Sequence, residues 1–142
     1  DINPWRREFA ASFGAVALDG SDEQAVRQAC PDMAFDSTGK EAARRLALTA
    51  LGQRGSLVCV GHGEGLTLNV SADLIAPERG VLGSEYFRYD EMADNLRLLT
   101  ANQALVSRVI THVLPVQEIS KAFTLFLSGE TGKVVVTQDL AS

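Results

Sequence analysis

The stretch SLVCVGHGEG, residues 56–65, decides the fold class of this chain. Five small or apolar residues come first, and three glycines then alternate with His62 and Glu64. The pattern predicts a buried strand that runs into an open loop. Because ligands of α/β proteins bind at the carboxyl ends of parallel strands, we expect this loop to face a ligand. Glycine there would let the backbone lie close to a flat or charged group that a Cβ would keep away.

Helical and strand patterns alternate along the rest of the chain. Asn3 and Ser21 are expected to cap two helices, and Gly129 is expected to end the last one. Phe123 and Phe126 on that last helix are expected in the core. The strand patterns lie at residues 15–18, 33–36, 56–60, 66–70, 80–83 and 133–137, and the clearest helical pattern at 40–51. The alternation predicts an α/β fold with three αβα layers, a mostly parallel sheet and right-handed crossovers.

Length and composition restrict the classes of function. The chain has 142 residues, the size of one ordinary domain. Hydrophobic residues make up 46% of it and charged residues 22%, a composition that is typical of globular proteins. The net charge is −5 and no basic patch dominates, which argues against nucleic-acid binding. No apolar run is long enough to span a membrane. Cys30 and Cys59 belong to no CxxC motif, and we interpret them as small buried hydrophobes of a protein in the reducing cytoplasm.

The ordered segments resemble the second half of medium-chain, zinc-type alcohol dehydrogenases, a family that includes sorbitol and threonine dehydrogenases. No single motif is specific, but the order and spacing of the matching pieces are. These pieces are residues 1–10 with 13–15, then 33–39, 55–61, 80–84, 110–115 and 128–136. The resemblance implies a partial, truncated NAD-binding Rossmann domain over residues 1–108. Residues 109–142 resemble the segment that returns to the family's catalytic domain.

The resemblance also implies a set of cofactor-binding residues and assigns none to catalysis. Asp1 falls where an acidic residue binds the adenosine ribose hydroxyls, which favours NAD over NADP. On the adenosine side, Arg6 matches a residue that flanks the adenosine, and Ser37, Thr38 and Lys40 match residues near the adenine. On the nicotinamide side, Val60, Gly61 and His62 match residues beside the ring, and Val81, Leu82 and Gly83 match the segment that holds the carboxamide. Lys133 falls near a residue that contacts the pyrophosphate. The intact parent is expected to transfer a hydride between NAD(H) and an alcohol or carbonyl, with zinc in its catalytic domain polarising the oxygen.

The sequence departs from the family pattern at important places. It contains no phosphate-cradling G-x-G-x-x-G loop, no catalytic domain and no zinc ligands of that domain. We therefore expect a fragment that is inactive alone and binds NAD weakly or not at all. Rival interpretations are the zinc-independent quinone and enoyl reductase branch of the superfamily, and a non-catalytic α/β module that self-associates. Whether this chain is itself an enzyme stays open.

Several polar residues have plainer interpretations than ligand binding. His62 and Glu64 suggest a zinc site, but only one other histidine exists, so a polar loop residue at a strand end is the better interpretation of His62. Asp1 also fits a solvated terminal acid, and Arg6 a solvated helix face. Asp36 is expected to cap backbone amides of the turn at residues 37–39 rather than to catalyse, and Ser37 and Thr38 also fit turn formers.

A truncated Rossmann sheet would leave strand edges without partners. In the usual strand order, a gap two strands wide would separate residues 15–18 from residues 33–36. Unpaired edges are costly and promote association. We therefore expect either that residues 15–18 pair directly beside 33–36, or that chains form a homo-oligomer through their sheet edges. By resemblance, residues 66–70 are an edge strand that pairs across a dimer axis.

Overall fold

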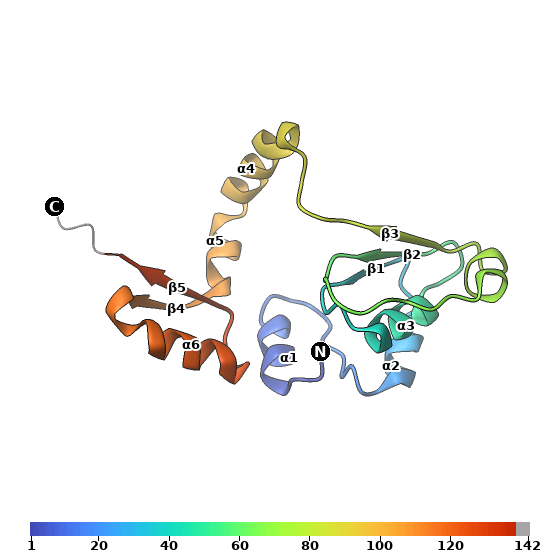
Figure 1. Ribbon diagram of the computed structural model, residues 1–142, viewed down its shortest axis with the longest axis horizontal. Helices are drawn as coiled ribbons and strands as arrows, with labels where there is room; N and C mark the ends of the chain where they lie inside the picture. The colour runs from blue at the N-terminus through green and yellow to red at the C-terminus, as the bar shows by residue number, and fades with distance from the viewer. Residues whose placement is uncertain (139–142) are drawn as a thin grey trace. The chain divides into compact units, whose positions relative to one another are not determined.

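The computed structural model describes residues 1–138, which divide into two units (Figure 1). One unit is Leu18–Tyr86, and the other joins Asp1–Ala17 to the chain from Phe87 onward. The boundary between residues 108 and 109, which the resemblance implies, concerns domains of the parent family and stays a prediction. No helix among residues 1–138 is long and apolar enough to cross a membrane.

The unit Leu18–Tyr86 is built on a parallel sheet of three strands in the order β1-β2-β3. The strands are β1 (Met33–Asp36), β2 (Ser56–Cys59) and β3 (Gly80–Gly83), with Met33 opposite Ser56 and Ser56 opposite Gly80. The helices are α2 (Glu23–Gln28), α3 (Glu41–Ala50) and the π-helix η1 (Val70–Ile75). Helices α2 and α3 pack on each other, and α3 also packs on β1 and β2. The predicted α/β class with a parallel sheet is confirmed.

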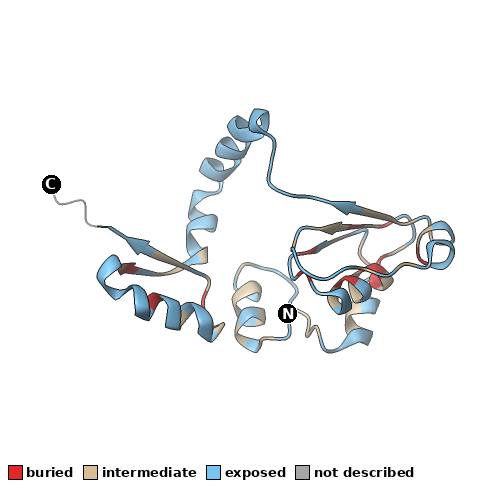
Figure 2. Ribbon diagram, viewed as in Figure 1, coloured by how far each residue is buried: buried red, intermediate tan, exposed pale blue. Residues whose placement is uncertain are grey.

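The core of this unit lies between α3 and one face of the sheet. Leu48 of the helix and Leu51, its C-cap residue, meet Leu57 of β2, and all three side chains are fully buried. Figure 2 colours buried residues red, and some of them lie in this unit. Residues that face each other across parallel strands share a face, so Ala34 and Val81 flank Leu57. Phe35, Val58 and Leu82 share the opposite face, where Phe35 is 67% exposed and Leu82 57% exposed.

The second unit contains α1 (Pro4–Ala11) and a parallel pair of strands joined through a helix. The strands are β4 (Ile110–Pro115) and β5 (Lys133–Thr137), and the chain between them forms η4 (Val116–Glu118) and α6 (Ile119–Ser128). Four helical segments precede β4: η2 (Tyr89–Glu91), α4 (Met92–Ala101), α5 (Gln103–Val106) and η3 (Ser107–Val109). Asn3 caps α1 by accepting from Trp5 N at 2.9 Å, and Gly129 ends α6 with φ 75°, as predicted. The aromatic rings of Trp5, Phe9 and Phe13 contact in series along α1, and Arg108 lies over the last of them.

Two predicted strands are wrong. Residues 15–18 form no strand, because no strand among the described residues pairs with them, and β1 pairs with β2 alone. The expected strand at 15–18 therefore does not form among the described residues, while association between chains stays a prediction. Residues 66–69 are a loop, in which side chains take the backbone groups that a neighbouring strand would use, and Val70 begins η1. Thr67 N donates to Glu41, Thr67 O accepts from Arg45, and Asn69 N donates to Asp73.

Other corrections concern single residues. The second helix is capped by Asp22 instead of Ser21, and the Asp22 carboxylate accepts from Ala25 N at 3.0 Å. Cys30 is exposed, with φ 42°, so it is not the buried hydrophobe that we expected, and both cysteines are free.

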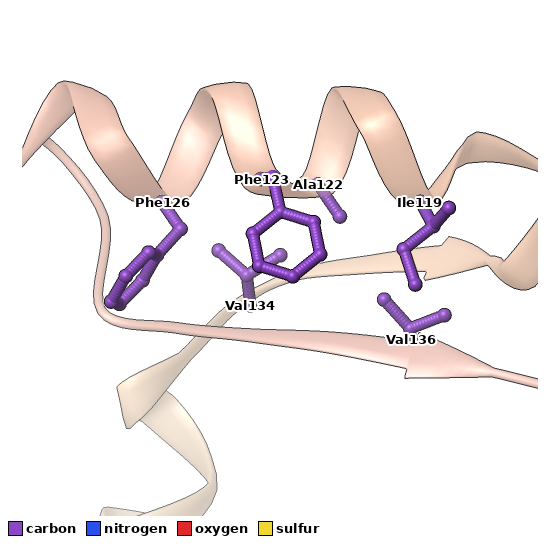
Figure 3. Close-up of a pocket in the computed structure, with 6 residues that line it drawn as sticks. All are labelled: Ile119, Ala122, Phe123, Phe126, Val134 and Val136. Carbon is purple, nitrogen blue, oxygen red and sulfur yellow. The ribbon is translucent and has the colours of Figure 1, made fainter.

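Phe123 and Phe126 are also not core residues, since they are 60% and 58% exposed. They line an open apolar groove of about 280 Å³ between α6 and β5 (Figure 3). The periodicity identified the apolar face of α6 correctly, but only Ala122 on that face is buried.

Candidate functional site

The carboxyl ends of β1, β2 and β3 lead into three loops that meet at one edge of the sheet (Figure 1). A cleft of about 500 Å³ opens there. Three parts of the unit line the cleft: α3, the end of β2 with the glycine loop that follows it, and the end of β3 with the residues after it. The lining residues are Arg44 from α3, then Cys59, Val60, Gly61, His62, Gly63 and Glu64, and finally Gly83, Ser84 and Glu85. Such an edge is where open α/β sheets bind ligands. The predicted residues Val60, Gly61, His62 and Gly83 all lie in this lining.

The glycine loop, residues 61–65, packs its backbone against the turn that follows β1. A Cβ on Gly61 would lie 2.6 Å from the carbonyl carbon of Ser37, and a Cβ on Gly39 would collide with the carbonyl of His62. Gly39 also has φ 69°, a conformation that side chains disfavour. Gly39 and Gly61 are therefore required because two backbone segments touch, which is a different reason from the ligand access that we expected of the loop glycines.

Asp36 sits at the end of β1 and organises that turn, as predicted. Its carboxylate accepts from Thr38 N at 2.8 Å, from Thr38 Oγ1 at 2.6 Å and from Gly39 N at 3.2 Å. It also forms an ion pair of 2.8 Å with Arg44 Nε of α3, and the Asp36 side chain is only 2% exposed. Burial alone would raise the pKa of Asp36, but the hydrogen bonds from Thr38, Arg44 and Gly39 outweigh it and lower the pKa.

Arg44 extends this network to the glycine loop. Its Nη2 donates to Gly61 O, and its Nη1 donates to Glu64 O and, at 3.4 Å, to Gly65 O. The guanidinium therefore contacts the first carbonyl of the loop, the last two, and the end of β1. Only 10% of the Arg44 side chain is exposed. Sequence reasoning missed this residue.

Glu64 links the same loop to the start of α3. Its carboxylate accepts from Lys40 Nζ at 3.0 Å and from Glu41 N at 2.8 Å. The N-cap residue Lys40 makes no side-chain capping bond, so Glu64 supplies an acceptor for this helix terminus from outside the helix. The hydrogen bonds from Glu41 N and from Lys40 lower the pKa of Glu64.

His62 lines the same cleft, and its side chain is accessible. Its Nε2 is 3.3 Å from Glu85 Oε1, and the two side chains are 82% and 60% exposed. Glu85 follows β3, so this contact joins the loops after β2 and β3 across the cleft. Within residues 1–138, no three His, Cys, Asp or Glu side chains gather closely enough to hold a metal ion.

The remaining predicted residues lie elsewhere. Val81 and Leu82 are inside β3, with Val81 packed on the core and Leu82 exposed on the other face. Ser37 and Thr38 form the turn after β1, and Lys40 pairs with Glu64 beside the cleft.

Asp1, Arg6 and Lys133 belong to the other unit. Asp1 Oδ1 accepts from Asn3 N at 2.8 Å, Arg6 Nε donates to Gly129 O at 3.2 Å, and Lys133 begins β5.

Comparison with known proteins gives consistent matches. The family model for zinc-binding dehydrogenases matches residues 1–101. The chain is 32% identical over 105 residues to the uncharacterized zinc-type alcohol dehydrogenase-like protein YphC of Escherichia coli, covering 74% of this chain and 30% of that protein. It is 26% identical over 149 residues to L-threonine 3-dehydrogenase of Coxiella burnetii, covering 96% and 42%. An alcohol dehydrogenase from Thermotoga maritima superposes with a TM-score of 0.83 at 22% identity, over 96% of this chain and 41% of that one.

Proposed function

This chain belongs to the zinc-binding dehydrogenase family, and from that membership we propose that it supplies the nicotinamide-binding part of an NAD-dependent oxidoreductase. It spans 30% of YphC and 41% to 42% of the other relatives described above. In this proposal the intact parent transfers a hydride between NAD(H) and an alcohol or carbonyl. The observation that carries the proposal is the cleft into which the loops after β2 and β3 both open.

The cleft fits the nicotinamide end of the cofactor in size and chemistry. About 500 Å³ is in the range of small-molecule sites, and its lining combines glycine backbone with a few polar side chains. NAD(H), when bound, supplies or accepts the hydride. In the proposal, the backbone at Val60, Gly61 and His62 lies beside the nicotinamide ring. The backbone of β3 at Val81, Leu82 and Gly83 orients the carboxamide.

The proposal assigns the rest of the cofactor to residues outside the cleft. Ser37, Thr38 and Lys40 are assigned to the adenine side, and Arg6 to the adenosine. Asp1 is assigned to the ribose hydroxyls, where its charge would repel a 2′-phosphate and favour NAD. Lys133 is assigned to the pyrophosphate.

Zinc does not fit the described residues, because they contain no cluster of three possible ligands. The proposal therefore gives this chain no metal, and no residue of it a catalytic role. Alone, the chain is expected to be inactive and to bind NAD(H) weakly, since its sequence has no G-x-G-x-x-G phosphate loop.

Two further parts of the proposal concern assembly and location. Within the described residues, β1 and β3 each pair only with β2, so both edges of the three-stranded sheet carry unpaired backbone groups. Such edges favour strand pairing between chains, which supports a homo-oligomer.

The two free thiols, Cys30 and Cys59, support a cytoplasmic protein.

Saturation-transfer NMR with millimolar NADH tests the proposal without requiring tight binding. Irradiation of the protein should transfer saturation to the nicotinamide ring protons, because the cleft holds that end of the cofactor. His62→Ala should reduce this transfer. Arg54→Ala should leave it unchanged, because Arg54 precedes β2 and pairs with Glu78 beyond the amino end of the sheet. No transfer to the nicotinamide protons, or equal transfer in all three proteins, would contradict the proposal.

A further inference from the structure

Arg44 is the one side chain of the described cleft lining that contacts both flanks of the glycine loop, residues 61–65. We propose that Arg44 is a positioning residue, which fixes the shape of this loop before a ligand arrives and so presents His62 at the cleft. The identity of that ligand rests on the proposed function. The fixing of the loop by Arg44 does not.

The guanidinium contacts leave little freedom to the flanks of the loop. Its Nε donates to the buried Asp36 carboxylate at 2.8 Å, while its two terminal nitrogens donate to the carbonyls of Gly61, Glu64 and Gly65. Asp36 in turn accepts Gly39 N at 3.2 Å, and Gly39 O accepts Glu64 N at 2.7 Å. The loop is therefore connected at both ends to the end of β1 and to α3.

The loop needs an external constraint because of its composition. Three of its five residues are glycine, which loses more conformational freedom on ordering than any other residue. The side chain of His62, the second residue of the loop, is 82% exposed and contacts Glu85 at 3.3 Å. The fixed flanks therefore determine where His62 stands. A loop already ordered loses less entropy when a ligand binds.

Arginine is suited to this role in a way that lysine is not. A guanidinium presents a rigid, planar fork of donors, whereas an ammonium is a point charge on a flexible stem. Arg44→Lys keeps the charge beside Asp36 but cannot reach the carboxylate and the loop carbonyls together. Arg45→Lys is a matched control on the same helix, because Arg45 pairs with Asp73 and makes none of the contacts of Arg44 to the glycine loop.

Backbone amide hydrogen exchange on the 142-residue chain tests the proposal directly. In Arg44→Lys, the Glu64 amide should exchange at least about tenfold faster, while the core amides of Leu48 and Leu57 keep their rates. Arg45→Lys should leave the Glu64 amide unchanged. An unchanged Glu64 rate in Arg44→Lys would overturn the proposal. Equal acceleration at Leu48 and Leu57 would overturn it too, because Arg44 would then act on the whole unit.

Nucleotide titration separates this inference from the proposed function. With NADH and AMP as probes, Arg44→Lys should weaken NADH binding about tenfold and leave AMP binding unchanged, since only NADH carries the nicotinamide. Faster exchange at Glu64 without any nucleotide effect would retain the positioning role and remove the nicotinamide ligand. Unchanged exchange would remove the positioning role, whatever the nucleotides do.

Discussion

Replacing Asp36 by asparagine removes one acceptor from the centre of the site without changing its shape. The carboxylate accepts from Thr38 N, Thr38 Oγ1, Gly39 N and Arg44 Nε. The side chain of asparagine has one acceptor oxygen in place of two. If this oxygen still accepts the hydrogen bonds from Gly39 N and Arg44 Nε, the N–H of Thr38 loses its acceptor. An orphaned N–H costs about 1–3 kcal/mol, and neutralising the bond to Arg44 costs about 1 kcal/mol more. Asp36→Asn should therefore destabilise the unit Leu18–Tyr86 by about 3 kcal/mol.

Hydrogen exchange of the Leu48 and Leu57 amides measures the opening of this unit separately from the other one. A loss of about 3 kcal/mol should accelerate these amides roughly 100-fold. Glu78→Gln is the control, because Glu78 pairs with Arg54, the two side chains are 51% and 77% exposed, and such a pair contributes about 1 kcal/mol or less. Equal effects of the two variants, or a loss below about 1 kcal/mol in Asp36→Asn, would refute the reasoning.

Gly61→Ala should destabilise the same unit by about 1–3 kcal/mol, because its Cβ would lie 2.6 Å from the carbonyl carbon of Ser37. Gly65→Ala, which has open space around it, should change stability by less than about 0.5 kcal/mol, and urea melts compare the two. The folded pKa of Asp36 is lowered, so its contribution is present above the unfolded pKa of about 3.9 and is lost as the pH falls through the folded value. Urea melts between pH 6 and pH 2 should show this loss, and the difference between wild type and Asp36→Asn should shrink over that range. Gly129→Ala should destabilise the other unit by about 1 kcal/mol, because φ is 75° there, and Trp5 fluorescence during urea unfolding reports the change.

Local patterns predicted the elements whose causes are local. The strands at 33–36 and 80–83 and the helix at Glu41–Ala50 follow from short apolar runs and from helical spacing. Asp36 was predicted as a turn cap because its partners lie two and three residues further on. The strands expected at 15–18 and 66–70 fail because alternation of apolar residues does not show whether a neighbouring strand exists to pair with.

The contacts that shape the cleft depend on tertiary structure and could not be derived from spacing in the same way. Arg44 reaches carbonyls about twenty residues away, because α3 packs on β1 and β2 and the glycine loop packs against the turn after β1. One signal was available: Arg44 lies four positions before Leu48 and seven before the C-cap residue Leu51, in line with the buried side of the helix. A charged residue in such a stripe needs a buried partner, and Asp36 is that partner.

The nicotinamide end of NAD(H) is proposed to bind in the cleft at the carboxyl ends of β1, β2 and β3. Amide chemical shifts of the isotope-labelled chain, followed during titrations with NADH and with AMP, test this most directly. NADH should shift the amides of Gly61, His62 and Gly83, and AMP should leave these three unmoved. Identical shifts with both nucleotides, or NADH shifts confined to residues outside the cleft, would contradict the account.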